Sequence, residues 1–347
     1  MDLIDFKTTF DGILQEYVDR KIKQSTQLLS NPRTNTFVEY VQTFIFSWGK
    51  RIRPYVLRAV YMGLGGTKEK EIFHIGIIFE LFHTMALIHD DIMDSADKRH
   101  NAMTMHAFIQ TQLSAAPNKQ HVAQSQAILV GDLLLTWVYE LWYKTQRSDE
   151  LLLDKARINI HGMIEEVVLG QMLDVDMEVS GPASLELIDK KNRYKTASYT
   201  FVRPMITWAI LAGASEEVQQ QVADLGLHLG LAFQVRDDLM DLTGGDKTKS
   251  AFSDIQEGQQ TYFTHYIFEH GTTEQKGLLA SCLGKQLDEG KIDELKKLFQ
   301  ETWAIDRGKQ QIDDHLHQAK LLFEEIPLTN IEAKESFAHM MKKMENK

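Results

Sequence analysis

The stretch LIHDDIMDSADKRH, residues 87–100, passes directly from apolar side chains into acids. Four aspartates lie within it: Asp90, Asp91, Asp94 and Asp97. The preceding residues 76–89, GIIFELFHTMALIH, are largely apolar, as expected for a buried helix. Carboxylates at the end of a buried helix are costly unless an opposite charge compensates them. The stretch therefore predicts a buried helix whose carboxyl end carries a charged site.

Helical spacing continues through the rest of the chain. Apolar side chains recur every three or four positions in residues 9–22, and residues 128–144 are apolar nearly all round. Strand-like alternation bounded by turn residues is hard to find. Short breaks are expected near residues 30–35, 63–70, 114–120, 180–184 and 243–254, and none is long enough to link two domains. We therefore predict an all-α fold with a single domain over residues 1–347.

The composition excludes several classes of protein. With 347 residues, 43% of them hydrophobic, the chain can bury a sizeable core. Its formal net charge of -11 would repel nucleic acid, so we expect no nucleic-acid partner. The one cysteine, Cys282, fits a reducing compartment. Because the sequence shows neither a signal-peptide pattern nor an apolar stretch of roughly 18 residues, we expect a cytoplasmic protein without a transmembrane segment.

A second acidic cluster has the same D-D-x-x-D pattern as the first. Residues 231–246, LAFQVRDDLMDLTGGD, place Asp237, Asp238 and Asp241 at the end of another apolar segment. Because positions i and i+4 share a helix face, the outer aspartates of each motif project together and repel each other. Proteins hold Mg²⁺ through one or two carboxylates together with substrate phosphates. One such motif could be a solvated helix end, but two favour a metal site.

Basic residues accompany the two motifs. They occur in WGKRIRP, residues 48–54, in NRYKTAS, residues 192–198, and at Arg99. Lysine and arginine bind phosphate oxygens without a metal ion. Each basic group alone could be a solvated patch. In one chain with two Mg²⁺-type motifs, they predict two diphosphate sites, one using metal ions and one using lysine and arginine.

Six motifs, in order along the chain, resemble those of the trans-isoprenyl diphosphate synthases, or polyprenyl synthetases. They are GKRIRP (49–54), HTMALIHDDIMD (83–94), GDLLL (131–135), GQMLD (170–174), KTASYTF (195–201) and FQVRDDLMD (233–241). The resemblance covers residues 45–262, followed by C-terminal helices in 263–347. Within the family, the chain looks most like the geranylgeranyl diphosphate synthases.

The resemblance implies a fold and a reaction. The family fold is a bundle of roughly a dozen helices around a central hydrophobic cavity, usually in a homodimer. The reaction is the head-to-tail condensation of isopentenyl diphosphate with an allylic diphosphate, using Mg²⁺ as cofactor with about three ions per active site. The implied product is a short-chain trans-polyprenyl diphosphate. We expect geranylgeranyl diphosphate, with a farnesyl or longer product as the alternative.

The resemblance also implies roles for individual residues. The implied metal ligands are Asp90, Asp91, Asp94, Asp237, Asp238 and Asp241. The implied contacts to the allylic diphosphate are Arg99, Lys195 and Lys249. The implied polar lining beside the reacting carbons is Gln171, Thr196 and Gln234, with Asp174 supporting the metal cluster. The implied contacts to isopentenyl diphosphate are Lys50, Arg53 and His83, although His83 could instead be a core histidine.

Three positions depart from the family pattern. His100 stands where the family has a second arginine that binds isopentenyl diphosphate, and histidine is a weaker cation near neutral pH. Gln259 follows Gly258 where the family has a lysine, so one contact to the allylic phosphate is expected to be lost. Trp48 replaces a glycine before Gly49.

The residues one to two helical turns before Asp90 are expected to form the floor of the hydrocarbon cavity. Ala86 leaves room, Met85 fills part of the space, and Phe82 closes it. Because one helical turn rises about 5.4 Å, close to one five-carbon unit, these residues favour a product of roughly fifteen to twenty-five carbons. The alternative is that they are ordinary core residues.

Two other functions remain open. A terpene cyclase of the same fold usually carries one D-D-x-x-D motif and lacks the G-K-R-x-R-P motif that contains Lys50 and Arg53. A non-catalytic partner subunit of a heteromeric prenyl synthase tends to lose aspartates, whereas all six are present here. His100 and Gln259 keep the partner subunit as an alternative.

Overall fold

The computed structural model describes residues 3–47, 49, 51–99, 102–113, 117–145, 149–244 and 252–345. Within these ranges the chain is built almost entirely from helices. The one pair of strands there is a two-residue hairpin of β1 (Lys98–Arg99) and β2 (Ala102–Met103). The predicted all-α fold is confirmed. In the same ranges, no helix is long and apolar enough to cross a membrane.

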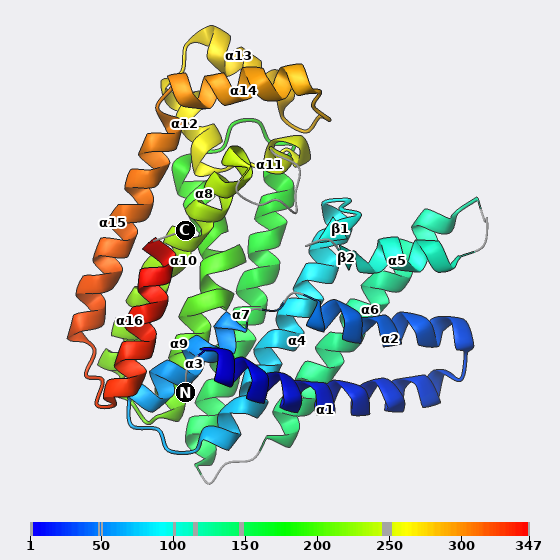
Figure 1. Cartoon of the computed structure of the whole chain (residues 1–347), viewed down its shortest axis with the longest axis vertical. Coiled ribbons are helices and arrows are strands. Elements are labelled where there is room, and N and C mark those ends of the chain that lie inside the picture. The colour runs from blue at the N-terminus through cyan, green and yellow to red at the C-terminus, as the bar shows by residue number, and fades with distance from the viewer. Residues whose placement is uncertain are drawn as a thin grey trace. The chain divides into compact units, whose positions relative to one another are not determined.

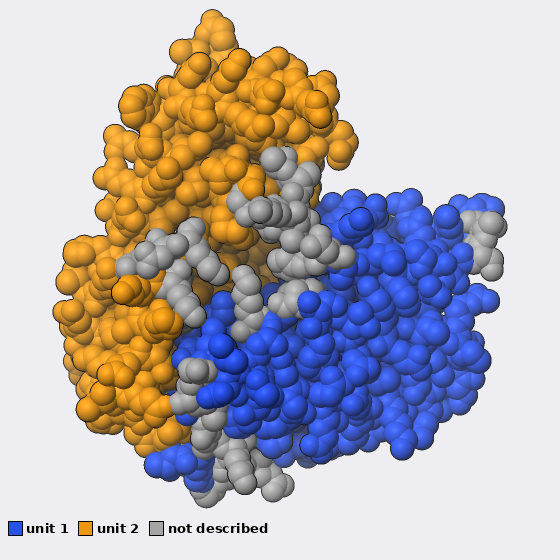
Figure 2. Space-filling model, viewed as in Figure 1, with its two compact units in different colours: residues 1–58, 67–150 blue, residues 59–66, 151–347 orange. Residues whose placement is uncertain are grey.

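The chain divides into two compact units, shown in Figure 2. Unit 1 contains residues 1–58 and 67–150, and unit 2 contains residues 59–66 and 151–347. The helix α3 (Ile52–Gly63) contributes residues to both units. The single domain over the whole chain and its central cavity stay predictions.

Unit 1 is a small helical bundle (Figure 1). Besides the start of α3, its helices are α1 (Leu3–Leu29), α2 (Pro32–Phe46), α4 (Glu69–Met93), α5 (Met105–Gln112) and α6 (Lys119–Lys144). The long helices α4 and α6 pack along each other, and α1 packs on α2 and α4. At the contact of α1 with α4, the rings of Phe6 and Phe73 lie 5.7 Å apart in a buried aromatic cluster. This cluster lies at the amino end of α4, whose carboxyl end carries the first aspartate motif.

Unit 2 is built around α10 (Glu216–Thr243), which carries the second aspartate motif. The preceding elements are α7 (Glu150–Met177), α8 (Leu185–Asn192), η1 (Arg193–Val202) and α9 (Arg203–Leu211). The following ones are α11 (Ser253–Glu257), α12 (Tyr262–His270), α13 (Thr273–Cys282), α14 (Glu289–Glu301), α15 (Ala304–Glu325) and α16 (Ile331–Glu345). The helix α10 packs against η1, α9 and α15, and Figure 1 shows α15 running alongside it.

The element η1, which carries the KTASYTF motif, is a π-helix. Such helices are rare and often mark functional sites. Two glycines allow its neighbours to approach it closely. A Cβ at Gly170 of α7 would lie 2.5 Å from the backbone nitrogen of Lys195, and a Cβ at Gly230 of α10 would lie 2.4 Å from the Cβ of Ala197. Both distances are too short for a side chain, so these glycines hold η1 close to α7 and α10.

Candidate functional site

The first aspartate motif forms the carboxyl end of α4 in unit 1. The Asp91 carboxylate is completely buried, whereas the Asp90 side chain is 20% exposed. Arg99 of β1 contacts both, with its guanidinium 2.7 Å from Asp91 Oδ1 and 3.3 Å from Asp90 Oδ2. Asp94 follows the last helical residue, and its backbone N–H donates to the Asp90 carbonyl at 2.9 Å. The structure thus brings the three aspartates together with an arginine as counter-ion.

Arg99 is the allylic diphosphate contact implied by the sequence, and here it also acts as an internal cation. Burial alone would lower the pKa of its guanidinium, but the charges of Asp91, Asp90 and Asp94 raise that pKa above its ordinary value. One guanidinium cannot balance three carboxylates. Their carboxylate oxygens are also the kind of ligand that suits a divalent cation.

The three aspartates of the second motif, on α10 in unit 2, lie in different environments. Asp237 is exposed, and Asp238 and Asp241 are buried. Asp241 Oδ1 accepts a hydrogen bond from the Ser253 backbone N–H at 3.0 Å, and its Oδ2 accepts one from the Asp254 N–H at 3.2 Å. Asp241 therefore binds the amino end of α11, a structural task in addition to the metal binding that the sequence implies.

Asp238 is a buried carboxylate with a hydrogen-bond donor at one of its two oxygens. Its Oδ1 accepts a hydrogen bond from Gln234 Nε2 at 2.7 Å, and its Oδ2 has no donor among the residues that the structure describes. Burial raises the pKa of Asp238 to about 7, an effect that Lys191 and Gln234 reduce and that Asp237 and Asp241 increase. Burying an ionised carboxylate with an unpaired oxygen is unfavourable, so this position fits a bound cation.

Asp174 of α7 is the centre of a buried ion cluster in unit 2. Lys195 Nζ of η1 donates to its Oδ2, and Lys191 Nζ of α8 lies 3.2 Å from its Oδ1. Burial alone would raise the pKa of Asp174, but Lys191 and Lys195 hold it below its ordinary value. In the structure, Asp174 therefore forms ion pairs with two ammonium groups.

The sequence reasoning missed Lys191, which is only 5% exposed although it is a lysine. Its Nζ also donates to the Gln260 carbonyl at 2.9 Å. Gln259, the position expected to have lost a cation, is turned toward the same cluster. In the amide orientation that its neighbours favour, its nitrogen donates to Asp174 at 2.8 and 3.1 Å. In the sequence, the sign of this arrangement is that a lysine stands three residues after Ile188, on the face that α8 buries.

A second ion pair holds η1 at its carboxyl end. Arg203 Nε donates to Glu166 Oε2 of α7 at 2.9 Å, and its Nη1 donates to Asn159 Oδ1 at 2.9 Å. Ser198 of η1 also donates to Glu166. The π-helix that carries Lys195 is therefore fixed both by ion pairs and by the glycine contacts, although nothing in the sequence predicted Glu166 and Arg203 as partners.

The two described arginines of the GKRIRP segment differ in burial, which the sequence did not show. Arg51 is 4% exposed and its guanidinium is turned into unit 1, whereas Arg53, in the first turn of α3, is half-buried. His83 of α4 is also half-buried. Three implied substrate contacts lie outside the described residues: Lys50, His100 and Lys249.

The remaining implied residues lie on the elements that carry the motifs. Thr196 lies on η1 and Gln171 on α7, both half-buried. On α4, Phe82 is 1% exposed, Met85 is 7% exposed, and Ala86 is half-buried. Their roles in substrate binding and in product length stay predictions.

In the GDLLL motif on α6, the glycine leaves room for a side chain of α4. A Cβ at Gly131 would lie 2.2 Å from His89 Nε2, so glycine leaves the space that His89 fills. The same ring nitrogen lies 3.1 Å from the Ile128 carbonyl. Because His89 directly precedes Asp90, this contact between α4 and α6 fixes the helix at the start of the first motif.

The aspartate carboxylates fit a divalent cation that takes its remaining ligands from water or phosphate. Within the described ranges, no group of three or more histidine, cysteine or acidic side chains could hold a metal ion by itself. Hard carboxylate oxygens nevertheless suit Mg²⁺, which usually keeps several water or phosphate ligands. The unpaired Oδ2 of Asp238 is the position that most clearly fits such an ion.

Known proteins are similar to this chain over most of its length. A family model described as Polyprenyl synthetase matches residues 34–302. The geranylgeranyl pyrophosphate synthase of Geoglobus acetivorans is 28% identical over 308 residues, which are 87% of this chain and 88% of the relative. The farnesyl diphosphate synthase of Bacillus subtilis (strain 168) is 32% identical over 264 residues, which are 74% of this chain and 83% of the relative.

Among solved structures, a geranylgeranyl pyrophosphate synthase from Corynebacterium glutamicum, complexed with isoprenyl diphosphate and magnesium, is similar over the whole length. It is 27% identical to this chain, with a TM-score of 0.93, and the match covers 100% of this chain and 99% of the other.

Proposed function

Because this chain belongs to the polyprenyl synthetase family, we propose that it condenses isopentenyl diphosphate head-to-tail with an allylic diphosphate. The enzyme is a trans-prenyltransferase that makes a short-chain polyprenyl diphosphate. The observation that carries this proposal is Asp238, a buried carboxylate with an unpaired oxygen inside a D-D-x-x-D motif. When ionised, such a group is stabilised by a bound cation, as expected in a metal-dependent synthase.

The reaction needs charge stabilisation but no nucleophilic side chain. The C–O bond of the allylic diphosphate breaks, the double bond of isopentenyl diphosphate attacks the carbocation, and a proton is lost to the departed diphosphate. Mg²⁺ bound to the aspartates of a D-D-x-x-D motif would supply positive charge that stabilises the departing diphosphate. Lys195 and Arg99, the implied contacts to the allylic diphosphate, each add a fixed positive charge suited to phosphate oxygens.

Asp174 and Asp91 keep these two cations in place before the substrate binds. Lys195 donates to Asp174, and Arg99 contacts the fully buried Asp91. Preorganised charges of this kind lower the barrier because they need little rearrangement as the reaction proceeds. Thr196, beside Lys195 on η1, supplies a hydroxyl next to the developing carbocation.

The favoured product is geranylgeranyl diphosphate, with farnesyl and longer products as the alternatives. The resemblance to the Geoglobus acetivorans enzyme supports the first product, and the resemblance to the Bacillus subtilis enzyme supports the shorter one. Phe82 and Met85 on α4 set the length in this proposal.

We also propose that the enzyme is a cytoplasmic homodimer. Along α7, Ile158, Leu169 and Met172 are 73%, 51% and 64% exposed, at positions that fall on one face of the helix. Soluble monomers rarely expose contiguous apolar surface of this kind, so a second copy is expected to cover it. Light scattering on the wild type and on Met172→Asp tests the dimer, which the variant should weaken.

One incubation tests the reaction. The purified protein is mixed with Mg²⁺, isopentenyl diphosphate and dimethylallyl, geranyl or farnesyl diphosphate, and the dephosphorylated products are sized by mass spectrometry. We expect linear C15 to C25 alcohols, or roughly three to five isoprene units at one helical turn each, and none with EDTA. Absence of product from the protein alone would favour the partner subunit, and a cyclic hydrocarbon would favour the cyclase.

A further inference from the structure

We propose that Arg51 is a positioning residue of the isopentenyl diphosphate site. It does not touch the substrate. Instead, its guanidinium joins α1, the GKRIRP segment and α4, and thereby fixes the backbone that carries the implied phosphate contacts. This inference rests on the proposed function, because it assigns Arg53 and His83 to isopentenyl diphosphate.

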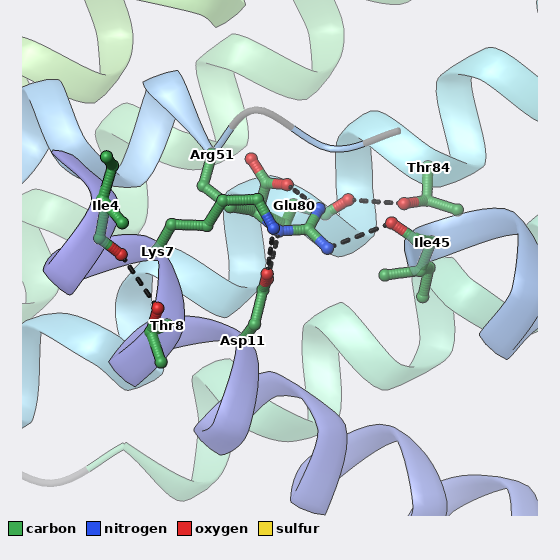
Figure 3. Close-up of polar contacts among 8 residues, drawn as sticks. All are labelled: Ile4, Lys7, Thr8, Asp11, Ile45, Arg51, Glu80 and Thr84. Atoms are coloured by element: carbon green, nitrogen blue, oxygen red, sulfur yellow. Dashed lines mark hydrogen bonds and ion pairs between the residues drawn. The ribbon is translucent and has the colours of Figure 1, made fainter. Parts of the chain in front are cut away.

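All three nitrogens of the Arg51 side chain donate hydrogen bonds inside unit 1, as Figure 3 shows. It is 3% exposed, and its three nitrogens point to three different partners. Nε donates to Asp11 Oδ1 of α1 at 2.6 Å, and Nη1 donates to Glu80 Oε2 of α4 at 2.7 Å. Nη2 donates to the Ile45 carbonyl at the end of α2, at 3.0 Å. A buried guanidinium with these partners cannot also bind a phosphate group.

The backbone around Arg51 is shaped by this side chain. Arg51 has a φ of +54°, a left-handed conformation that residues with a Cβ rarely adopt. Gly49 explains how the segment closes, because a Cβ there would lie 2.0 Å from Arg51 Nη1. Gly49 thus lies against the Arg51 guanidinium, and removing the guanidinium would remove what holds the left-handed turn.

The network ends beside the implied substrate contacts. Arg53 follows Arg51 by two residues, and Lys50 precedes it in the sequence. On α4, Glu80 lies one turn before His83 and Thr84, and Thr84 Oγ1 donates to the Glu80 carbonyl at 2.8 Å. One guanidinium therefore joins the segment that carries Arg53 to the helix turn that carries His83.

The charges of the network are balanced, and Arg51 and Glu80 are buried. Two cations, Arg51 and Lys7, face two carboxylates, Asp11 and Glu80, and Lys7 donates to Asp11 (Figure 3). Burial alone would lower the pKa of Arg51, but Glu80 and Asp11 raise it above its ordinary value. Glu80 is 4% exposed, so a variant without Arg51 leaves a buried carboxylate without its cation.

Steady-state kinetics of Arg51→Lys and Arg51→Met test the proposal. Lysine keeps the charge but not the planar fork that reaches three partners. We expect both variants to raise the KM for isopentenyl diphosphate about tenfold or more, because small displacements of positioning groups have effects of that size. The KM for the allylic substrate should stay within about twofold. Isopentenyl diphosphate alone should also raise the Tm of the wild type more than that of either variant.

Lys21→Met is the matched control. Lys21 is also on α1, is 8% exposed, and forms a comparable ion pair with Glu140 of α6 that does not involve the GKRIRP segment. This variant should lower the Tm and leave the KM for isopentenyl diphosphate unchanged.

The possible outcomes separate the two proposals. A wild type that makes no product overturns the proposed function. An active wild type whose Arg51 variants change both KM values equally, or lower only the Tm, overturns the positioning role. Retained folding by circular dichroism in Arg51→Lys, together with a selective rise in the KM for isopentenyl diphosphate, supports it.

Discussion

Replacing Asp238 with asparagine should stabilise the metal-free protein while abolishing turnover. Burial raises the pKa of Asp238 to about 7, whereas an unfolded aspartate titrates near about 3.9. The folded state therefore holds its proton more tightly, and this carboxyl makes folding less favourable as the pH rises from about 4 to about 7. A shift of about 3 pKa units corresponds to an upper bound of about 4 kcal/mol at pH 8. At pH 5 the same calculation leaves about 1.5 kcal/mol, because the folded carboxyl is then protonated.

Thermal unfolding of wild type and Asp238→Asn in EDTA, at pH 5 and pH 8, measures this effect. At about 2–4 °C per kcal/mol for a large domain, the variant should gain several degrees at pH 8 and less at pH 5. Asp237→Asn is the comparison variant: Asp237 is exposed and its charge only adds to the raised pKa of Asp238, so its neutralisation should raise the Tm by less. Equal Tm values for wild type and Asp238→Asn at pH 8 would refute the reasoning, as would Mg²⁺ stabilising both proteins equally.

Four further results are expected. Asp90→Ala should lower kcat at least about a hundredfold with a folded protein, and activity that survives EDTA would contradict the metal site. Phe82→Ala removes a fully buried ring at a cost of about 3–5 kcal/mol, and mass analysis should show a main product longer by at least one isoprene unit. Gly230→Ala should lower stability by about 1–3 kcal/mol in urea unfolding, because its Cβ would lie 2.4 Å from the Cβ of Ala197. Lys191→Met removes one of two ammonium groups at a buried carboxylate, so it should raise the KM for the allylic substrate by about tenfold and leave that for isopentenyl diphosphate unchanged.

The positions of the helices follow largely from local sequence. The apolar residues before Asp90 form α4, and the break expected near residues 30–35 separates α1 from α2, where Asn31 caps the helix and Pro32 begins it. The break near residues 180–184 separates α7 from α8 in the same way. Such signals lie within a few residues of the structure they specify, so spacing alone reveals them.

The sequence also located the aspartate motifs at helix ends, but not the different states of their carboxylates. Asp237, Asp238 and Asp241 share one short motif, yet one is exposed, one has a raised pKa, and one binds the amino end of α11. Periodicity shows which face of a helix is buried, and it does not show what lies across from that face.

The amino-acid sequence by itself determined that the chain is helical, where its acidic motifs lie and which family they resemble. Only the tertiary structure decided that Arg51 turns inward, that Lys191 joins Asp174, and that KTASYTF forms a π-helix. The physical reason is distance along the chain. Arg51 meets Asp11 from 40 residues away, and Lys191 meets the Gln260 carbonyl from 69 residues away. Such partners are chosen by packing between helices, and a window of sequence contains only one side of each contact.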